Sequence, residues 1–315
     1  MKKIKSTVLT IFRFLKNSPK TTIGLILVLL ILILTLGAEF FTTHDPMMRY
    51  TGEYHTAPNS QFILGTTRLG RDVWSQTLYG GRVSILVGVM SAMISTIIGL
   101  AVGISSGYFG GIFDSIISAI INVFMVVPQL VLLLIIASMM GGVSPVIIAA
   151  IIGLTSWAYN ARILRAQTMS IRNREFIYSA ETLGESKFRI LFVEIMPNML
   201  SIITTSFIGT IIYAIMAQSF MEMIGFGDPL SVTWGTMLYN AQSTGALNSG
   251  IWWEVLGPGL AIIILGAGLT LINFSIDEVS NPKLKAQRIM SIYNKLQKKK
   301  NKSPLEYGAN NKGGQ

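Results

Sequence analysis

The sequence has 315 residues, of which 51% are hydrophobic and only 13% are charged, and its formal net charge is +10. Because soluble domains average about 25% charged residues, this composition predicts an integral membrane protein rather than a soluble one. The absence of cysteine excludes thiol catalysis, thiolate metal sites and disulfides.

The N-terminal part of the chain predicts a first membrane helix. Residues 1–20 carry six Lys or Arg and no acid, and residues 21–41 follow as an apolar run with one acid, Glu39, near its end. About 20 apolar residues span a bilayer, so we expect a membrane helix whose N-terminus is cytoplasmic. A cleaved signal peptide is the alternative, but the run is long and many further apolar runs follow.

Residues 42–82 form a mixed polar loop, which we expect outside the membrane. Near its end, the spacing of Val73 and Thr77 predicts a short interfacial helix. Trp74 and Tyr79 are placed as aromatic residues of the membrane interface.

Five more apolar runs are candidate spans, at residues 83–106, 113–139, 144–159, 198–223 and 255–274. A glycine-rich turn at residues 107–111 separates the first two of these. Pro128 lies inside the third span of the chain, where it predicts a kink. The kink is either a hinge or static.

The distribution of basic residues predicts the topology. Six spans from a cytoplasmic N-terminus place residues 1–20, 160–197 and 276–315 inside, with 21 of the 25 Lys and Arg. The other four all lie in residues 42–82. This asymmetry follows the positive-inside rule. We therefore predict an all-α membrane protein with six transmembrane helices and both termini in the cytoplasm.

This topology divides the chain into three parts. Residues 1–82 contain the N-terminus, the first span and the outer loop. Residues 83–280 form a core with five spans and a cytoplasmic loop at about residues 160–197. Residues 281–315 form a basic cytoplasmic tail. Contact with anionic lipid headgroups explains this tail, so we expect membrane lipid and not nucleic acid as its partner.

Few residues are placed to carry out chemistry. No phosphate-binding loop occurs, and the dipeptide Gly-Lys is absent. We find no set of catalytic residues and predict that the chain is not an enzyme. Both histidines, His44 and His55, lie in the outer loop. A metal site would need more ligands nearby, so we interpret them as solvated and predict no metal site.

Polar residues within the spans are functional candidates. Asp114 begins the third span, where a carboxylate favours a helix N-terminus. Glu222, at the outer end of the fifth span, either lines a solute path or is an interfacial acid. Gln129, Gln218 and Asn273 either line a polar path or bond between helices. Gln129, Gln218 and Glu222 are our candidates for a translocation path.

The most informative stretch is the polar segment at residues 178–198, which lies between apolar runs. Around it, apolar or small residues recur at helical spacing, at Ile177, Ala180, Gly184, Phe188 and Leu191. Gly184 is placed to end one helix and Ser186 to cap the next. Pro197 then opens the following apolar run. This pattern predicts a helix–turn–helix on the membrane surface that presses an apolar stripe into a groove of another protein.

Five positions of this segment resemble a known motif, namely Ala180, Glu181, Gly184, Ile195 and Pro197. They are similar to the EAA loop of permease subunits of ABC importers, which reads Glu-Ala-Ala, three residues, Gly, nine or so residues, then Ile-x-Leu-Pro. The most similar sub-family is the dipeptide, oligopeptide and nickel permeases of the second-subunit type. The resemblance covers roughly residues 15–285. Two departures are residues 273–282, which differ from the usual ending, and Glu222, which stands where a small residue is common.

The resemblance implies a role in transport. It implies an ABC importer permease fold, a second homologous permease subunit, two ATPase subunits that dock on the EAA loop, and an extracytoplasmic substrate-binding protein. ATP and Mg would then be bound by the partner ATPase subunits, with no cofactor in this chain. The expected substrates are di- or oligopeptides, and nickel or a metal–chelator complex is the alternative. A secondary transporter is the alternative class, but we see no coupling acids at the midplane.

Overall fold

The computed structural model describes residues 19–140, 143–280 and 290. Residues 1–18 and the predicted tail, apart from Met290, lie outside this part of the chain. The elements are α2 (Pro19–Leu36), α3 (Ala38–Phe41), α4 (Val73–Phe109), α5 (Gly111–Val126), α6 (Gln129–Met140), α7 (Pro145–Arg172), α8 (Glu175–Thr182), α9 (Lys187–Arg189), η1 (Ile190–Ile195), η2 (Met196–Met199), α10 (Leu200–Met221), η3 (Glu222–Phe226), α11 (Trp234–Ser243) and α12 (Trp253–Ser280). No strand occurs among the described residues.

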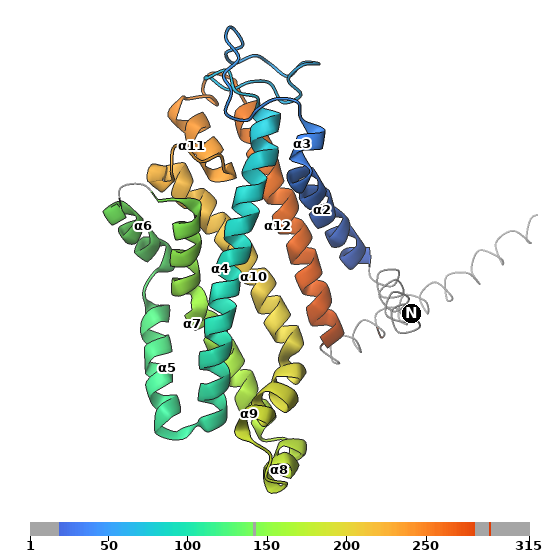
Figure 1. Cartoon of the computed structure of the whole chain (residues 1–315), viewed down its shortest axis with the longest axis vertical. Helices are drawn as coiled ribbons and strands as arrows, with labels where there is room; N and C mark the ends of the chain where they lie inside the picture. The colour runs from blue at the N-terminus through green and yellow to red at the C-terminus, as the bar shows by residue number, and fades with distance from the viewer. Residues whose placement is uncertain (1–18, 141–142, 281–289, 291–315) are drawn as a thin grey trace, which may run out of the picture.

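The long helices form an elongated bundle (Figure 1). Five of them are long and apolar enough to cross a membrane, and the bent pair α5–α6 makes six if it is counted as one span. The loop that precedes α4 lies at one end of the bundle, and α8 and α9 lie at the opposite end (Figure 1). The predicted all-α membrane fold is confirmed, while the assignment of either end to the cytoplasm remains a prediction.

The predicted third span is not one helix. It breaks between α5 and α6, and the two helices are bent by 76°. Pro128 disfavours a helical conformation of the residue before it. Accordingly, Val127 is extended, with φ −72° and ψ 124°. The proline therefore ends one helix and opens another, which is a larger change than the predicted kink.

The start of α4 corrects a second prediction. The expected interfacial helix and the second span are one continuous helix from Val73. Asp72 caps it, because its carboxylate accepts hydrogen bonds from the backbone N–H groups of Trp74 at 3.2 Å and Ser75 at 3.1 Å. The Trp74 indole donates to the Phe41 carbonyl oxygen at 3.1 Å, which ties the new helix to the end of α3.

Helices α4 and α7 pack closely over most of their length. Gly99, Gly103 and Gly107 recur every four residues on α4, and such a stripe of small residues lets two backbones approach. A Cβ atom at Gly103 would lie 2.6 Å from the Ala161 carbonyl oxygen, and one at Gly107 would lie 2.6 Å from that of Arg165. Gly107 was expected in a turn. It is helical, and the turn falls at residues 110–111.

This packing also explains why α7 continues beyond its predicted end at residue 159. The first part of the expected loop, residues 160–172, belongs to the same helix. Arg165, predicted to be a loop residue, forms a bidentate ion pair with Asp114 at the start of α5, with N–O distances of 2.5 and 2.6 Å. Asp114 therefore does more than begin a helix, because it also fastens α5 to α7.

The histidines of the outer loop are not solvated as predicted. The His44 ring stacks on Phe62 with centroids 4.9 Å apart, and its Nδ1 atom lies 3.4 Å from the Asp72 carboxylate. His55 lies against Glu254 of α12, with 3.9 Å between Nε2 and Oε1. Both side chains are mostly buried, since the loop folds back on the ends of α4 and α12. The two rings hold the loop in place.

Candidate functional site

Helix α8 and the segment after it form a hairpin at one end of the bundle, which we call the coupling hairpin (residues 175–199). Gly184 ends α8 with φ 77°, a conformation that glycine adopts without strain. The N–H of Gly184 bonds to the Glu181 carbonyl oxygen, and the N–H of Glu185 bonds to that of Ala180, both at 3.1 Å. This pair of bonds is a Schellman cap. The predicted end of the helix at Gly184 is confirmed.

The second arm of the coupling hairpin also begins as predicted. The Ser186 hydroxyl accepts a hydrogen bond from the Arg189 backbone N–H at 3.3 Å, which caps the new helix. From there the chain stays helical through η1 and η2 into α10. Pro197 lies in η2 just before α10 begins. The hairpin is thus directly continuous with a membrane-spanning helix.

The buried face of the coupling hairpin differs from the predicted stripe. Ile177, Ala180, Ile190 and Ile195 are buried and belong to one hydrophobic cluster with residues of α4 and α7. Phe188, which was predicted to lie on this stripe, is 71% exposed. The left-handed turn at Gly184 breaks the helical period, so positions before and after it do not share one face.

Three contacts bring together the coupling hairpin, the end of α4 and the end of α7. The Tyr108 hydroxyl donates a hydrogen bond to the Glu181 carboxylate at 2.9 Å. The Arg172 guanidinium lies over the Tyr108 ring, 5.8 Å from its centroid, and the Lys187 ammonium lies 5.5 Å from the centroid of Phe109. Cations over aromatic rings are attracted to them. Glu181 is therefore bonded to a residue of its own chain.

The outward face of the coupling hairpin is apolar. Leu183, at the turn, is 82% exposed, and Phe188 and Phe192 lie beside each other with ring centroids 4.4 Å apart. Glu185 and Arg189 flank them as an ion pair with an N–O distance of 2.5 Å. Contiguous exposed apolar side chains rimmed by charges are typical of a protein–protein contact.

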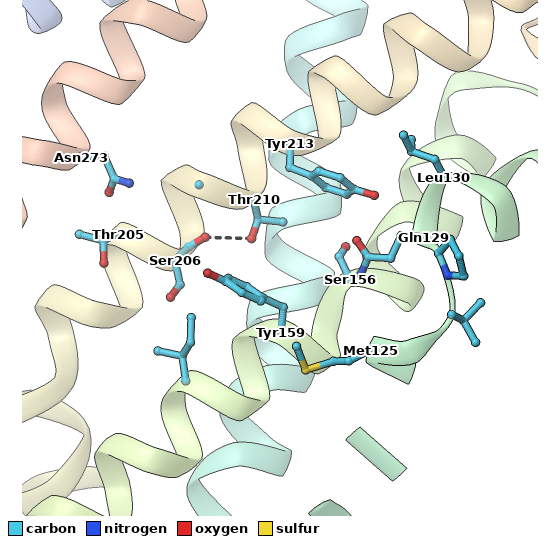
Figure 2. Close-up of a pocket in the computed structure, with 14 residues that line it drawn as sticks. Met125, Gln129, Leu130, Ser156, Tyr159, Thr205, Ser206, Thr210, Tyr213 and Asn273 are labelled. Atoms are coloured by element: carbon cyan, nitrogen blue, oxygen red, sulfur yellow. Dashed lines mark hydrogen bonds between the residues drawn. The ribbon is translucent and has the colours of Figure 1, made fainter. Parts of the chain in front are cut away.

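A cavity of about 800 Å³ opens midway along the bundle, where the break between α5 and α6 faces α7 and α10. Figure 2 shows the rings of Tyr159 and Tyr213 extending into this space from α7 and α10. The Tyr213 hydroxyl is buried and has no hydrogen-bond partner among the described residues. None of the residues that line the cavity is charged. The cavity can therefore accept hydrogen bonds and apolar contacts without selecting for charge.

Only one of the three path candidates lies in this cavity. Gln129 lines it from the start of α6, and its amide donates to the Thr155 carbonyl oxygen at 3.2 Å. Gln218, on α10, and Glu222, directly after it, are buried and do not line the cavity. Asn273, the other polar candidate, reaches the cavity from α12 (Figure 2).

Glu222 is 1% exposed and its hydrogen bonds are internal. It accepts from the Gln218 amide at 3.0 Å and from the Thr233 hydroxyl. Gly235 packs against it so closely that a Cβ atom would clash with the carboxylate. It is therefore not an exposed interfacial acid, and it joins the end of α10 to the start of α11.

The tyrosines of the cavity and Asn160 beside it were not among the predicted site residues. The Asn160 amide donates to the Ser95 hydroxyl at 2.9 Å and to the Thr210 hydroxyl at 3.1 Å, so it joins α4, α7 and α10. Tyr159 and Tyr213 were visible as polar groups in apolar runs, which is the signal that could have identified them. Asn160 directly follows the predicted span at residues 144–159 and was placed in the loop.

Comparisons with known proteins found a matching family model and several relatives. A family model described as binding-protein-dependent transport system inner membrane component matches residues 99–286. The chain is 32% identical, over 87% of its length and 85% of the relative, to a dipeptide transport system permease protein of Bacillus subtilis. It is 30% identical to an oligopeptide transport system permease protein of the same organism, over 86% of this chain and 88% of the relative. A di/tripeptide transport system permease protein of Pseudomonas aeruginosa is 29% identical, over 83% of this chain and 88% of the relative.

Proposed function

Because the chain belongs to the family of binding-protein-dependent transport system inner membrane components, we propose that it is the permease subunit of an ATP-driven importer of di- or oligopeptides. It is a multi-pass membrane protein. The names of its relatives refer to dipeptides, oligopeptides and di- or tripeptides, which favours peptides over the alternative of nickel or a metal–chelator complex.

The coupling hairpin is the proposed contact with an ATPase subunit. The observation that carries this proposal is its outward apolar face, with Leu183 and Phe188 exposed at the tip of the bundle. Its inner face is fixed by Ile177 and Ile195, which are buried against α4 and α7, and by the Tyr108–Glu181 hydrogen bond. A force applied to the outer face would thus reach α4, α7 and α10 together.

We propose that the cavity at the α5–α6 break is the part of the translocation path that this chain forms. Its uncharged lining suits peptides, which vary in charge but share a backbone that hydrogen-bonds. Gln129, Tyr159 and Tyr213 supply amide and hydroxyl groups, and Asn273 adds an amide from α12. A second, homologous permease subunit would close the open side of the cavity. Glu222 is assigned a structural role and not a place in the path.

The proposed importer also contains ATPase subunits and a substrate-binding protein. We propose that the ends of the chain and the coupling hairpin lie in the cytoplasm, where two ATPase subunits would bind ATP and Mg. The loop before α4 and α11 are placed outside, where a substrate-binding protein would dock. The absence of a Gly-Lys dipeptide supports the view that this chain has no phosphate-binding loop of its own.

Uptake by the assembled importer in proteoliposomes tests this function. A labelled dipeptide or oligopeptide should enter only when the binding protein is outside and ATP and Mg are available to the ATPase subunits. Uptake by the chain alone, without ATP, would contradict the proposal and favour a secondary transporter. ATP-driven uptake of nickel but of no peptide would support the ATP-driven importer and would show that its substrate is nickel and not a peptide.

A further inference from the structure

A small charged pocket lies at the end of the bundle opposite the coupling hairpin. It has a volume of about 200 Å³ and is formed where the outer loop, the beginning of α4, the end of α11 and the beginning of α12 meet. Its polar lining residues are Thr67, Arg68, Arg71, Gln76, Asn240, Thr244 and Glu254. We call it the Arg71 pocket. It is separate from the cavity at the α5–α6 break, with which it shares no lining residue.

Arg71 is the unusual residue of this pocket. Its side chain is half-buried, and its Nε atom is buried without a hydrogen-bond partner among the described residues. No acid in the described part of the chain lies within ion-pair distance of it, whereas Arg82 and Arg165 each pair with an acid. Burial and, after it, the like charge of Arg49 lower the pKa of Arg71. Because buried charges are normally paired, this guanidinium lacks an anion.

Glu254, the acid in the pocket, does not supply that anion. Its carboxylate accepts a hydrogen bond from the backbone N–H of Arg68 at 3.0 Å and lies 3.9 Å from His55. Glu254 is only 3% exposed, so it forms the wall of the pocket and holds the loop there. The guanidinium of Arg68 is exposed and has no acid within ion-pair distance among the described residues. The pocket therefore contains two arginines and one acid, Glu254, which already has a hydrogen-bond donor. Its net charge is positive.

We propose that the Arg71 pocket receives an aspartate or glutamate side chain of the substrate-binding protein. Arginine binds a carboxylate through two parallel hydrogen bonds, and an incoming acid would meet the part of the Arg71 guanidinium that lines the pocket. Pockets for whole ligands have volumes of about 300–1,000 Å³, so this smaller one suits a single side chain better than a peptide. The inference rests on the proposed function, which places this end of the bundle outside the membrane.

The test measures the concentration of binding protein that half-maximally stimulates ATP hydrolysis by the assembled importer in nanodiscs. For Arg71→Gln we expect this concentration to rise about tenfold, as for the loss of a charge-assisted hydrogen bond, with unstimulated hydrolysis unchanged. Arg49→Gln is the matched control. It removes the same charge from the same loop, but Arg49 is exposed and does not line the pocket. It should change the concentration by less than about threefold.

A charge exchange identifies the partner residue. Arg71→Glu should abolish docking, and replacing one acid of the binding protein by arginine should restore it. Such a rescue cannot come from a variant that fails to fold. If no acid restores docking, or if Arg49→Gln and Arg71→Gln have equal effects, the pocket is not the receptor of an acid.

Two further outcomes separate this inference from the function on which it rests. Stimulation of the native importer by the binding protein, with no change in Arg71→Gln, would overturn the pocket alone. A native importer that the binding protein does not stimulate would overturn both. An Arg71→Gln defect that appears only for peptides with a free carboxyl terminus would assign the pocket to the peptide and overturn the proposal.

Discussion

The hydroxyl of Tyr108, near the end of α4, donates a 2.9 Å hydrogen bond to the carboxylate of Glu181 in α8. This bond joins the coupling hairpin to a helix that runs the length of the bundle. We expect Tyr108→Phe to weaken the joint by about 1 kcal/mol, because the bond is lost while the buried ring is kept. The ATP hydrolysed per peptide transported should rise in this variant. Glu181→Gln, which keeps an acceptor oxygen, should have a smaller effect.

The result that would contradict this account is an unchanged ratio of ATP to peptide in Tyr108→Phe. The amount of ATPase subunit that copurifies with the variant serves as the control for assembly. It should stay at the native level, since Tyr108 is buried and does not belong to the outward face of the hairpin.

Substitution by alanine should have different effects at a tightly packed glycine of α4 and at an open glycine of α12. Gly103→Ala places a Cβ atom 2.6 Å from a carbonyl oxygen of α7 and should destabilise the protein by about 1–3 kcal/mol. Gly266→Ala in α12, where nothing lies within 4 Å, should be neutral or stabilise by up to about 1 kcal/mol. Thermal unfolding in detergent measures both. Equal melting temperatures would show that α4 and α7 do not pack as described.

Substitutions of Glu222 show whether this acid stabilises the fold or lines the translocation path. Glu222→Ala leaves the Gln218 amide and the Thr233 hydroxyl without their acceptor in a buried site. We expect a loss of about 2–4 kcal/mol, visible as a lower melting temperature and less assembled importer. Glu222→Gln keeps the shape and one acceptor and should lose less than half as much. Normal stability with abolished transport in Glu222→Gln would instead place Glu222 in the path.

The stability of the protein should depend on pH through His55 in the outer loop. Burial and, after it, the positive charge of Arg68 lower the pKa of His55 below its ordinary value of 6.5. The unfolded chain therefore binds this proton more tightly, so stability is lost as the pH falls below about 6.5. The melting temperature should decrease from about pH 7 to about pH 5, and less so in His55→Asn. Asparagine tolerates the φ of 52° found at His55. An identical pH dependence in the variant would exclude His55 as its source.

Features set by local sequence were predictable. The apolar runs located the spans because length and composition are what a bilayer requires. Gly184 and Ser186 were identified as cap residues because each acts on backbone groups of its own turn. The EAA-type motif was recognisable for the same reason, since its positions lie close together along the chain.

Features set by contacts between distant segments were not predictable. The chain stays helical to Arg172 because α7 packs against the glycines of α4, and Arg165 finds Asp114 from another helix. Phe188 was placed on the buried face because one helical period was extended across Gly184. Glu222 was expected at the membrane interface or in the translocation path. Its hydrogen-bond partner Thr233 lies 11 residues further along the chain, beyond a turn that the hydrophobic pattern could not locate.

Copurification shows whether the coupling hairpin binds the ATPase subunit. Phe188→Asp places a charge on the outward face of the coupling hairpin, and Phe40→Asp places one on an exposed phenylalanine at the other end of the bundle. With the tagged chain extracted from its native membrane, we predict that Phe188→Asp keeps the second permease but loses the ATPase, while Phe40→Asp keeps both. Retention of the ATPase by Phe188→Asp at the native level would contradict the assignment of this hairpin as the coupling element.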